Sequence, residues 1–144
     1  MIQYPISFTA KAHSKSGIQS SWIMESQDLE VQCAIPPEFE GPGGALSPED
    51  LFAQALTNCF LATFKVYAEK SKIRYSQVST TSELIVDLDE NKKPVMKKCI
   101  LNVEISGCEN ADRTTRIAER AFASGFILNS VKTELQFNLT ILNT

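Results

Sequence analysis

The sequence predicts a single α+β domain over residues 1–144, with antiparallel strands around one long central helix. Three observations support this class. Apolar and polar residues alternate in several short segments, one long apolar run follows a helix-start signal, and no low-complexity linker or internal repeat divides the chain. With 43% hydrophobic and 22% charged residues, the composition is that of an ordinary globular domain.

The first third of the chain is expected to form strands. Apolar residues alternate with polar ones over residues 6–13 and again over residues 29–35, which is the period of a strand with one buried face. Pro36 and Pro37 end the second segment, because proline cannot donate a hydrogen bond to a neighbouring strand. A glycine-rich loop follows at residues 41–44.

The long helix is expected to begin at Ser47 and to run to about Lys70. Ser47 is a good N-cap and Pro48 suits the first helical position. Glu49 and Asp50 place negative charge at the positive end of the helix dipole. Because most of its surface is apolar, this helix is expected to lie deep inside the protein, where a second subunit would help to cover it.

A hairpin is expected next, with strands over residues 84–88 and 99–105 joined by the turn DENKKP. Residues 110–124 then form an amphipathic helix, capped by Asn110, that turns Ile117, Ala121 and Phe122 inward. Gly125 is expected to close this helix in the left-handed conformation. Alternation over residues 131–141 predicts the last strand.

Charge and composition argue against several classes of function. A net charge of −3 and a pI of about 5.2 give no basic surface for nucleic acid or an anionic membrane. No apolar stretch approaches the ~20 residues that span a bilayer. No secretory signal is visible at the N-terminus, so a cytoplasmic location is expected. With a single histidine, His13, and no CxxC pair, neither a metal nor another cofactor is expected.

The four cysteines are expected to be free thiols with different surroundings. Cys33 and Cys99 lie in the apolar phase of predicted strands, which favours buried packing. Cys108 follows Gly107 in a loop, where its thiol is open to exposure. Cys59 lies on the apolar side of the long helix, and by position alone packing in the core is the simpler interpretation.

The stretch PGGALSPEDLFAQALTNCFLATF resembles the central motif of the OsmC/Ohr family of osmotically inducible and organic hydroperoxide resistance proteins. The resemblance includes the PGG loop, the Pro48-Glu49-x-Leu51 helix start and a cysteine ten residues after the glutamate. The order of strands and helices extends it over essentially the whole chain. It identifies the chain as one OsmC-like domain over residues 1–144.

The resemblance implies an intertwined homodimer with its active sites at the subunit interface. It also implies a stress-response peroxidase whose cysteine thiolate attacks an organic hydroperoxide, after which a second cysteine and a dithiol reductant regenerate the thiol. Cys59 matches the attacking cysteine, and Glu49 matches the glutamate that orients an activating arginine. Ten residues of helix separate the two by ~15 Å. A break in the helix or the partner subunit must therefore bring them together.

The sequence departs from this family pattern at two places. The activating arginine has no counterpart, since Arg74 is the first arginine in the chain; Lys11, Lys15 and His13 are the alternative cations. Spacing from the last strand places Gly125 where the family has its resolving cysteine.

Cys108 is then the best remaining thiol to resolve Cys59, and otherwise an external thiol must do so. Two functions follow. One is a thiol-dependent peroxidase that reduces organic hydroperoxides through Cys59. The other is a non-catalytic OsmC-like dimer that binds a small apolar or thiol-reactive molecule in an interfacial pocket.

Overall fold

The computed structural model describes residues 2–142, and the chain divides into two compact units between Leu51 and Phe52. No helix within residues 2–142 has the length and apolar character needed to cross a membrane.

The first unit holds a small antiparallel sheet of β1 (Lys11–His13), β2 (Trp22–Ser26) and β3 (Leu29–Cys33). The first expected strand is much shorter than its alternation predicts. Residues 5–10 lie outside any strand, and Phe8 is 86% exposed. A strand needs a hydrogen-bonded neighbour, and β2 pairs with the last three residues of this segment only. The second expected strand ends at Cys33, before Pro36, as predicted.

The glycine-rich loop leads from η1 (Pro37–Phe39) to the long helix. A side chain at Gly41 would collide with the backbone carbonyl of Ile35, so this position requires glycine. Ser47 caps the helix, since its Oγ accepts from the N–H of Asp50 (3.1 Å). The Asp50 carboxylate in turn accepts from the N–H of Ser47 (2.9 Å). This reciprocal pair is a capping box, which fixes the start of the helix.

Helix α1 (Pro48–Lys70) has the predicted bounds. In the second unit it buries one face, made by every fourth residue: Leu56, Phe60, Phe64 and Ala68. The expected cover of the remaining surface by a second subunit stays a prediction, since the second unit encloses this one face only. Val66, for example, is 49% exposed. One sheet can cover one face of a helix, and the second unit leaves the rest of the apolar surface of α1 uncovered.

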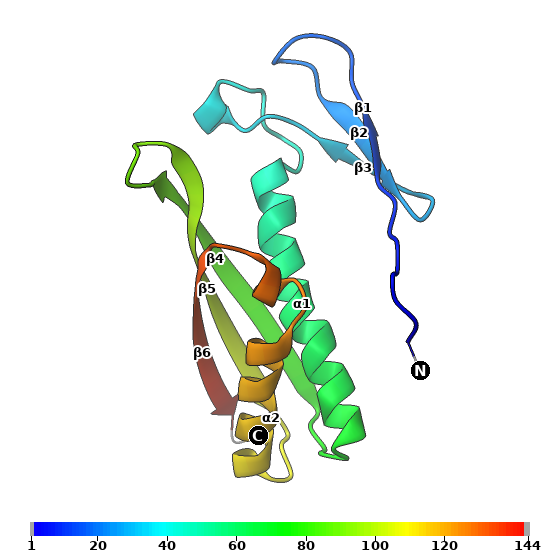
Figure 1. Ribbon diagram of the computed structural model, residues 1–144, viewed down its shortest axis with the longest axis vertical. Coiled ribbons are helices and arrows are strands. Elements are labelled where there is room, and N and C mark those ends of the chain that lie inside the picture. Colours follow the sequence, from blue (N-terminus) through cyan, green and yellow to red (C-terminus); the bar gives the residue numbers. More distant parts are fainter. Residues whose placement is uncertain (1, 143–144) are drawn as a thin grey trace. The chain divides into compact units, whose positions relative to one another are not determined.

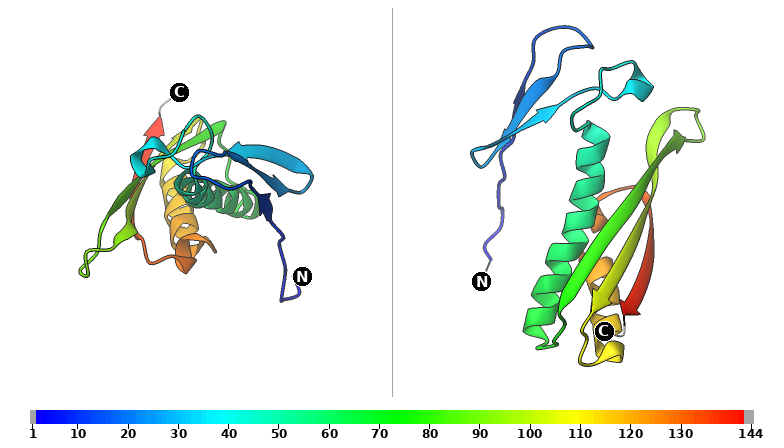
Figure 2. Two further views of the ribbon diagram at one scale, coloured as in Figure 1. Left: turned by 90° about the horizontal axis from the view of Figure 1, so that it is seen from above. Right: turned by 180° about the vertical axis from the view of Figure 1, so that it is seen from behind.

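The second unit is a three-stranded sheet in the order β4 (Gln77–Leu88), β5 (Pro94–Ser106), β6 (Glu134–Leu142). The predicted hairpin pairs β4 with β5 antiparallel, but β6 joins β5 in parallel, so the expectation of antiparallel strands is wrong for this pair. Both helices lie against the same face of this sheet (Figures 1 and 2). The β5 residues on that face are fully buried: Cys99, Leu101, Val103 and Ile105.

Helix α2 (Ala111–Ser124) confirms the second predicted helix, and the side chain of Asn110 caps it by accepting from the N–H of Arg113 (3.0 Å). Ile117 and Ala121 are buried and Phe122 is partly buried, as predicted. The left-handed conformation expected at Gly125 is wrong, because its φ and ψ are −59° and 133°. A short helix η2 (Leu128–Ser130) follows.

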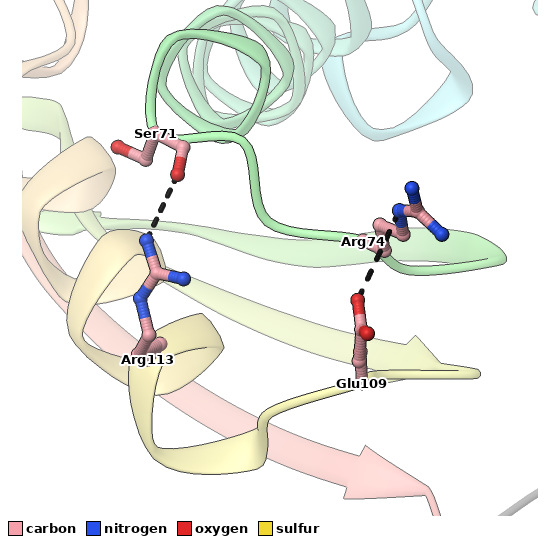
Figure 3. Close-up of polar contacts among 4 residues, drawn as sticks. All are labelled: Ser71, Arg74, Glu109 and Arg113. Carbon is pink, nitrogen blue, oxygen red and sulfur yellow. Dashed lines mark hydrogen bonds and ion pairs between the residues drawn. The ribbon is translucent and has the colours of Figure 1, made fainter.

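Polar contacts join the end of α1 to the start of α2 (Figure 3). Arg113 Nη2 donates to the backbone carbonyl of Ser71 (2.9 Å). Arg74 Nε lies 3.9 Å from the Glu109 carboxylate, and the N–H of Glu109 donates to the carbonyl of Arg74 (3.2 Å). These contacts hold the loop between β5 and α2 beside the C-terminal end of α1.

Candidate thiol site

Cys59 lies near the middle of α1 and is a free thiol. Its side chain is partly buried and packs against the core of the second unit. It is therefore neither a fully enclosed packing group nor a fully exposed one. Thr63 donates to the backbone carbonyl of Cys59 (2.7 Å), within the same helix.

Gly125, immediately after α2, faces the sulfur of Cys59. A Cβ atom built at this glycine would lie 2.9 Å from Cys59 Sγ and 2.9 Å from Leu128 Cδ1. Both distances are shorter than ordinary non-bonded contacts of carbon or sulfur. The glycine is thus explained by the close approach of the thiol and Leu128 to the backbone, and not by its backbone angles.

Aromatic side chains form part of the core beside this contact. Phe137 of β6 packs on Phe60 of α1, with ring centroids 5.2 Å apart, and on Phe122 of α2 at 4.7 Å. Such ring pairs contribute beyond the area they bury. They fix α1 and α2 on the same strand, and so fix the position of Cys59 relative to Gly125.

Two of the other cysteines are buried, as the sequence predicts. Cys33 is 1% exposed and Cys99 is 0% exposed. Burial raises the pKa of the Cys99 thiol above its ordinary value of 9.0, and a hydrogen bond from Ser82 lowers it by a smaller amount. Cys99 is thus held as a neutral packing thiol.

Cys108 lies far from Cys59 within one chain. The backbone N–H of its neighbour Glu109 donates to the carbonyl of Arg74. Arg74 lies three residues after Ser71, which directly follows α1. The helix between Cys59 and Ser71 is roughly 18 Å long at the usual α-helical rise. Independently, α2 separates Cys108 from Gly125 by 14 residues, or about 21 Å. A disulfide requires Cα atoms about 4.4–6.8 Å apart, so Cys108 cannot bond to Cys59 of the same chain.

Glu49 and Cys59 are not brought together by a break in the helix, because α1 is one continuous helix over Pro48–Lys70. The side chain of Glu49 is partly buried and, within residues 2–142, makes no ion pair. Of the two routes considered from the sequence, the partner subunit is the one that stays open.

Of the cations named from the sequence, Arg74 alone lies in the unit that holds Cys59. Arg74 follows α1 and lies beside Glu109, away from Cys59. His13 and Lys15 are exposed at the end of β1, in the other unit. No group of three or more potential metal ligands occurs within residues 2–142.

The comparison with known proteins agrees with this fold. Residues 41–140 match the family described as OsmC-like protein, so the chain belongs to that family. An uncharacterized protein of Acinetobacter baylyi is 35% identical over 65 residues. An organic hydroperoxide resistance protein of Xanthomonas axonopodis pv. citri is 29% identical over 68 residues. These matches span 45% and 46% of this chain, and 46% and 48% of the two relatives.

Solved structures share the fold over nearly the whole chain. An OsmC-like protein of unknown function from Vibrio cholerae has a TM-score of 0.83 at 17% identity, covering 94% of this chain and all of that one. An organic hydroperoxide resistance protein OsmC from Legionella pneumophila has a TM-score of 0.73 at 25% identity, covering 95% and 98%. The α+β, OsmC-like fold predicted from the sequence is thereby confirmed.

The role of Gly125 was only half visible in the sequence. Spacing from the last strand places it at the family's resolving cysteine, and in the structure this position faces the Cys59 sulfur. Its close approach to the thiol was missed, because a glycine after a helix has a simpler local explanation.

Proposed function

We propose that this protein is a homodimeric, thiol-dependent peroxidase that reduces organic hydroperoxides through Cys59. The observation that carries the proposal is the state of this one thiol: Cys59 is partly exposed beside a glycine, whereas Cys33 and Cys99 are fully enclosed. The names of the Xanthomonas and Legionella relatives supply the class of substrate.

In the proposed step the Cys59 thiolate attacks the outer oxygen of the hydroperoxide. The S–O bond forms as the O–O bond breaks, and the leaving alkoxide takes a proton and departs as an alcohol. Sulfur is oxidised by two electrons to a sulfenic acid, and the peroxide is reduced by the same two electrons. Glu49 is proposed to orient the activating cation across the subunit interface.

The apolar residues near Cys59 favour hydrophobic peroxides. Phe52, Leu56 and Phe60 follow at helical spacing on α1, and Phe60 packs on Phe137. Leu56 and Phe60 are fully buried in the core, so Phe52, which is partly exposed, is the one of the three proposed to contact the organic part of a substrate by excluding water.

A brief exposure of reduced protein to cumene hydroperoxide, followed by intact-mass measurement, tests the proposal. We expect the wild type to gain one oxygen atom, and Cys59→Ser to gain none. Cys108→Ser is the matched control, since it also removes a partly buried thiol, and it should be oxidised like the wild type. An unchanged wild-type mass, under conditions that oxidise an ordinary reactive thiol, would end the peroxidase proposal.

The second candidate is a non-catalytic dimer in which Cys59 lines a pocket for a small apolar or thiol-reactive molecule. This candidate is favoured by the glycine at position 125, because the family's resolving cysteine would stand there and a glycine has no thiol. In the same experiment this candidate predicts an unchanged mass with hydroperoxide.

A further inference from the structure

We infer that Cys59 works without a second cysteine, and that an external thiol reduces its sulfenic acid. This inference rests on the proposed function and names the second substrate of the same site. It follows from where the structure places the other three thiols and from what faces the Cys59 sulfur.

The residue facing Cys59 Sγ cannot react with it. That residue is Gly125, where an added Cβ would lie 2.9 Å from the sulfur. The Cβ of one cysteine lies about 3 Å from the sulfur of the other across a disulfide, given an S–S bond of ~2.04 Å. A cysteine here would therefore be in bonding position, and this chain has none.

The remaining thiols are excluded for separate reasons. Cys99 is fully buried in β5 with Ser82 as its hydrogen-bond partner, and Cys33 is fully buried in the first unit. Cys108 is held at the far end of both helices by the contacts of Glu109 and Arg113 (Figure 3). Reaching Cys59 of the same chain from there would require unfolding of α2 or of the end of α1.

Two molecules of a thiol, RSH, then return the Cys59 sulfenic acid to the thiol and complete the catalytic cycle. The first condenses with the sulfenic acid, so that an S–S bond forms, the S–O bond breaks and water leaves. The second attacks this mixed disulfide and releases RSSR, which returns Cys59 to the thiol. Two electrons from the two thiols balance the two electrons taken up by the hydroperoxide.

The test compares wild type, Gly125→Cys and Gly125→Ala. Each protein is oxidised with one equivalent of cumene hydroperoxide and then given ~0.1 mM glutathione, and Cys59 is examined by peptide mass spectrometry. We expect a glutathione adduct on wild-type Cys59. In Gly125→Cys an internal thiol at an effective concentration of at least ~1 mM should lower that adduct at least ~10-fold, in favour of a disulfide between Cys59 and the introduced cysteine.

Gly125→Ala is the matched control, because it adds the same Cβ beside Cys59 and Leu128 without a thiol. It should still form the adduct and no disulfide. Cys108→Ser should keep the wild-type adduct and the wild-type rate of glutathione-dependent turnover. Together the two controls separate crowding at the site from resolution by a second cysteine.

The inference and the proposed function fail in different ways. If wild-type Cys59 is oxidised but then forms a disulfide with Cys108, within or between chains, the inference is wrong and the peroxidase proposal stands. The same holds if Cys108→Ser abolishes turnover. If Cys59 is not oxidised at all, both are wrong.

Discussion

Among the described residues, the second unit of the chain buries twelve in one cluster, whereas in the first unit only Cys33, Ala34 and Ser47 are buried. Both segments show strand-like alternation, yet in the first the apolar side chains stay open. Phe8 is 86% exposed and Leu29 is 70% exposed. Large exposed apolar surface usually marks an interaction site. The difference shows that strand-like alternation in the first unit does not by itself produce a core within that unit.

The largest effect is expected in the core of the second unit. Phe60→Ala removes a fully buried ring that contacts Phe64 and Phe137, and should lower the free energy of unfolding by ~3–5 kcal/mol. Phe39→Ala, at a half-exposed ring of the first unit, should change it by less than ~0.5 kcal/mol. Urea denaturation measures both. Equal losses would show that the first unit has a core of its own.

The next prediction tests whether the partner subunit of the proposed homodimer covers the exposed apolar side chains of the first unit. Phe8→Ser should raise the dimer dissociation constant at least ~10-fold, since burying a phenylalanine side chain contributes roughly 1.5–3 kcal/mol. Analytical ultracentrifugation gives the constant. Phe8→Leu, which keeps an apolar side chain, should associate like the wild type. A serine variant that dimerises normally would show that the partner does not cover Phe8.

A smaller effect is expected at the start of α1, where the two units meet in sequence. Ser47→Ala removes the Oγ that accepts from the N–H of Asp50 and breaks the capping box. The expected loss is about 1 kcal/mol of unfolding free energy, measured by thermal or urea denaturation. Ser47→Asn, which retains a capping acceptor, should recover most of it; a loss equal to that of alanine would show that the cap contributes little.

The smallest effect is a pH dependence from Cys99. Its pKa is raised in the folded state by burial, so above the ordinary thiol pKa the unfolded chain ionises first. The unfolded state then binds fewer protons than the folded state, and stability falls as the pH rises above about 9. Cys99→Ala should flatten this part of the stability profile. Ser82→Ala should steepen it, because the hydrogen bond that favours the thiolate is lost.

The sequence by itself determined the features that depend on neighbouring residues. The capping box at Ser47 and the Asn110 cap involve groups three residues apart, and the hairpin of β4 and β5 follows from alternation on either side of one turn. Local hydrogen bonds and side-chain periods depend on short stretches of chain, so both helix starts were predicted at nearly their observed positions. The hairpin was also predicted, but its strands, Gln77–Leu88 and Pro94–Ser106, are longer than the predicted 84–88 and 99–105.

The tertiary structure decided what depends on how α1 and α2 pack on the sheet. Their packing sets Gly125 against the Cys59 sulfur and Cys108 at the opposite end of both helices, although Cys108 had been the best available partner by elimination. It also shows that a glycine expected as a left-handed cap is instead required by contact. Distances between residues far apart in the chain come from core packing, which sequence spacing does not contain.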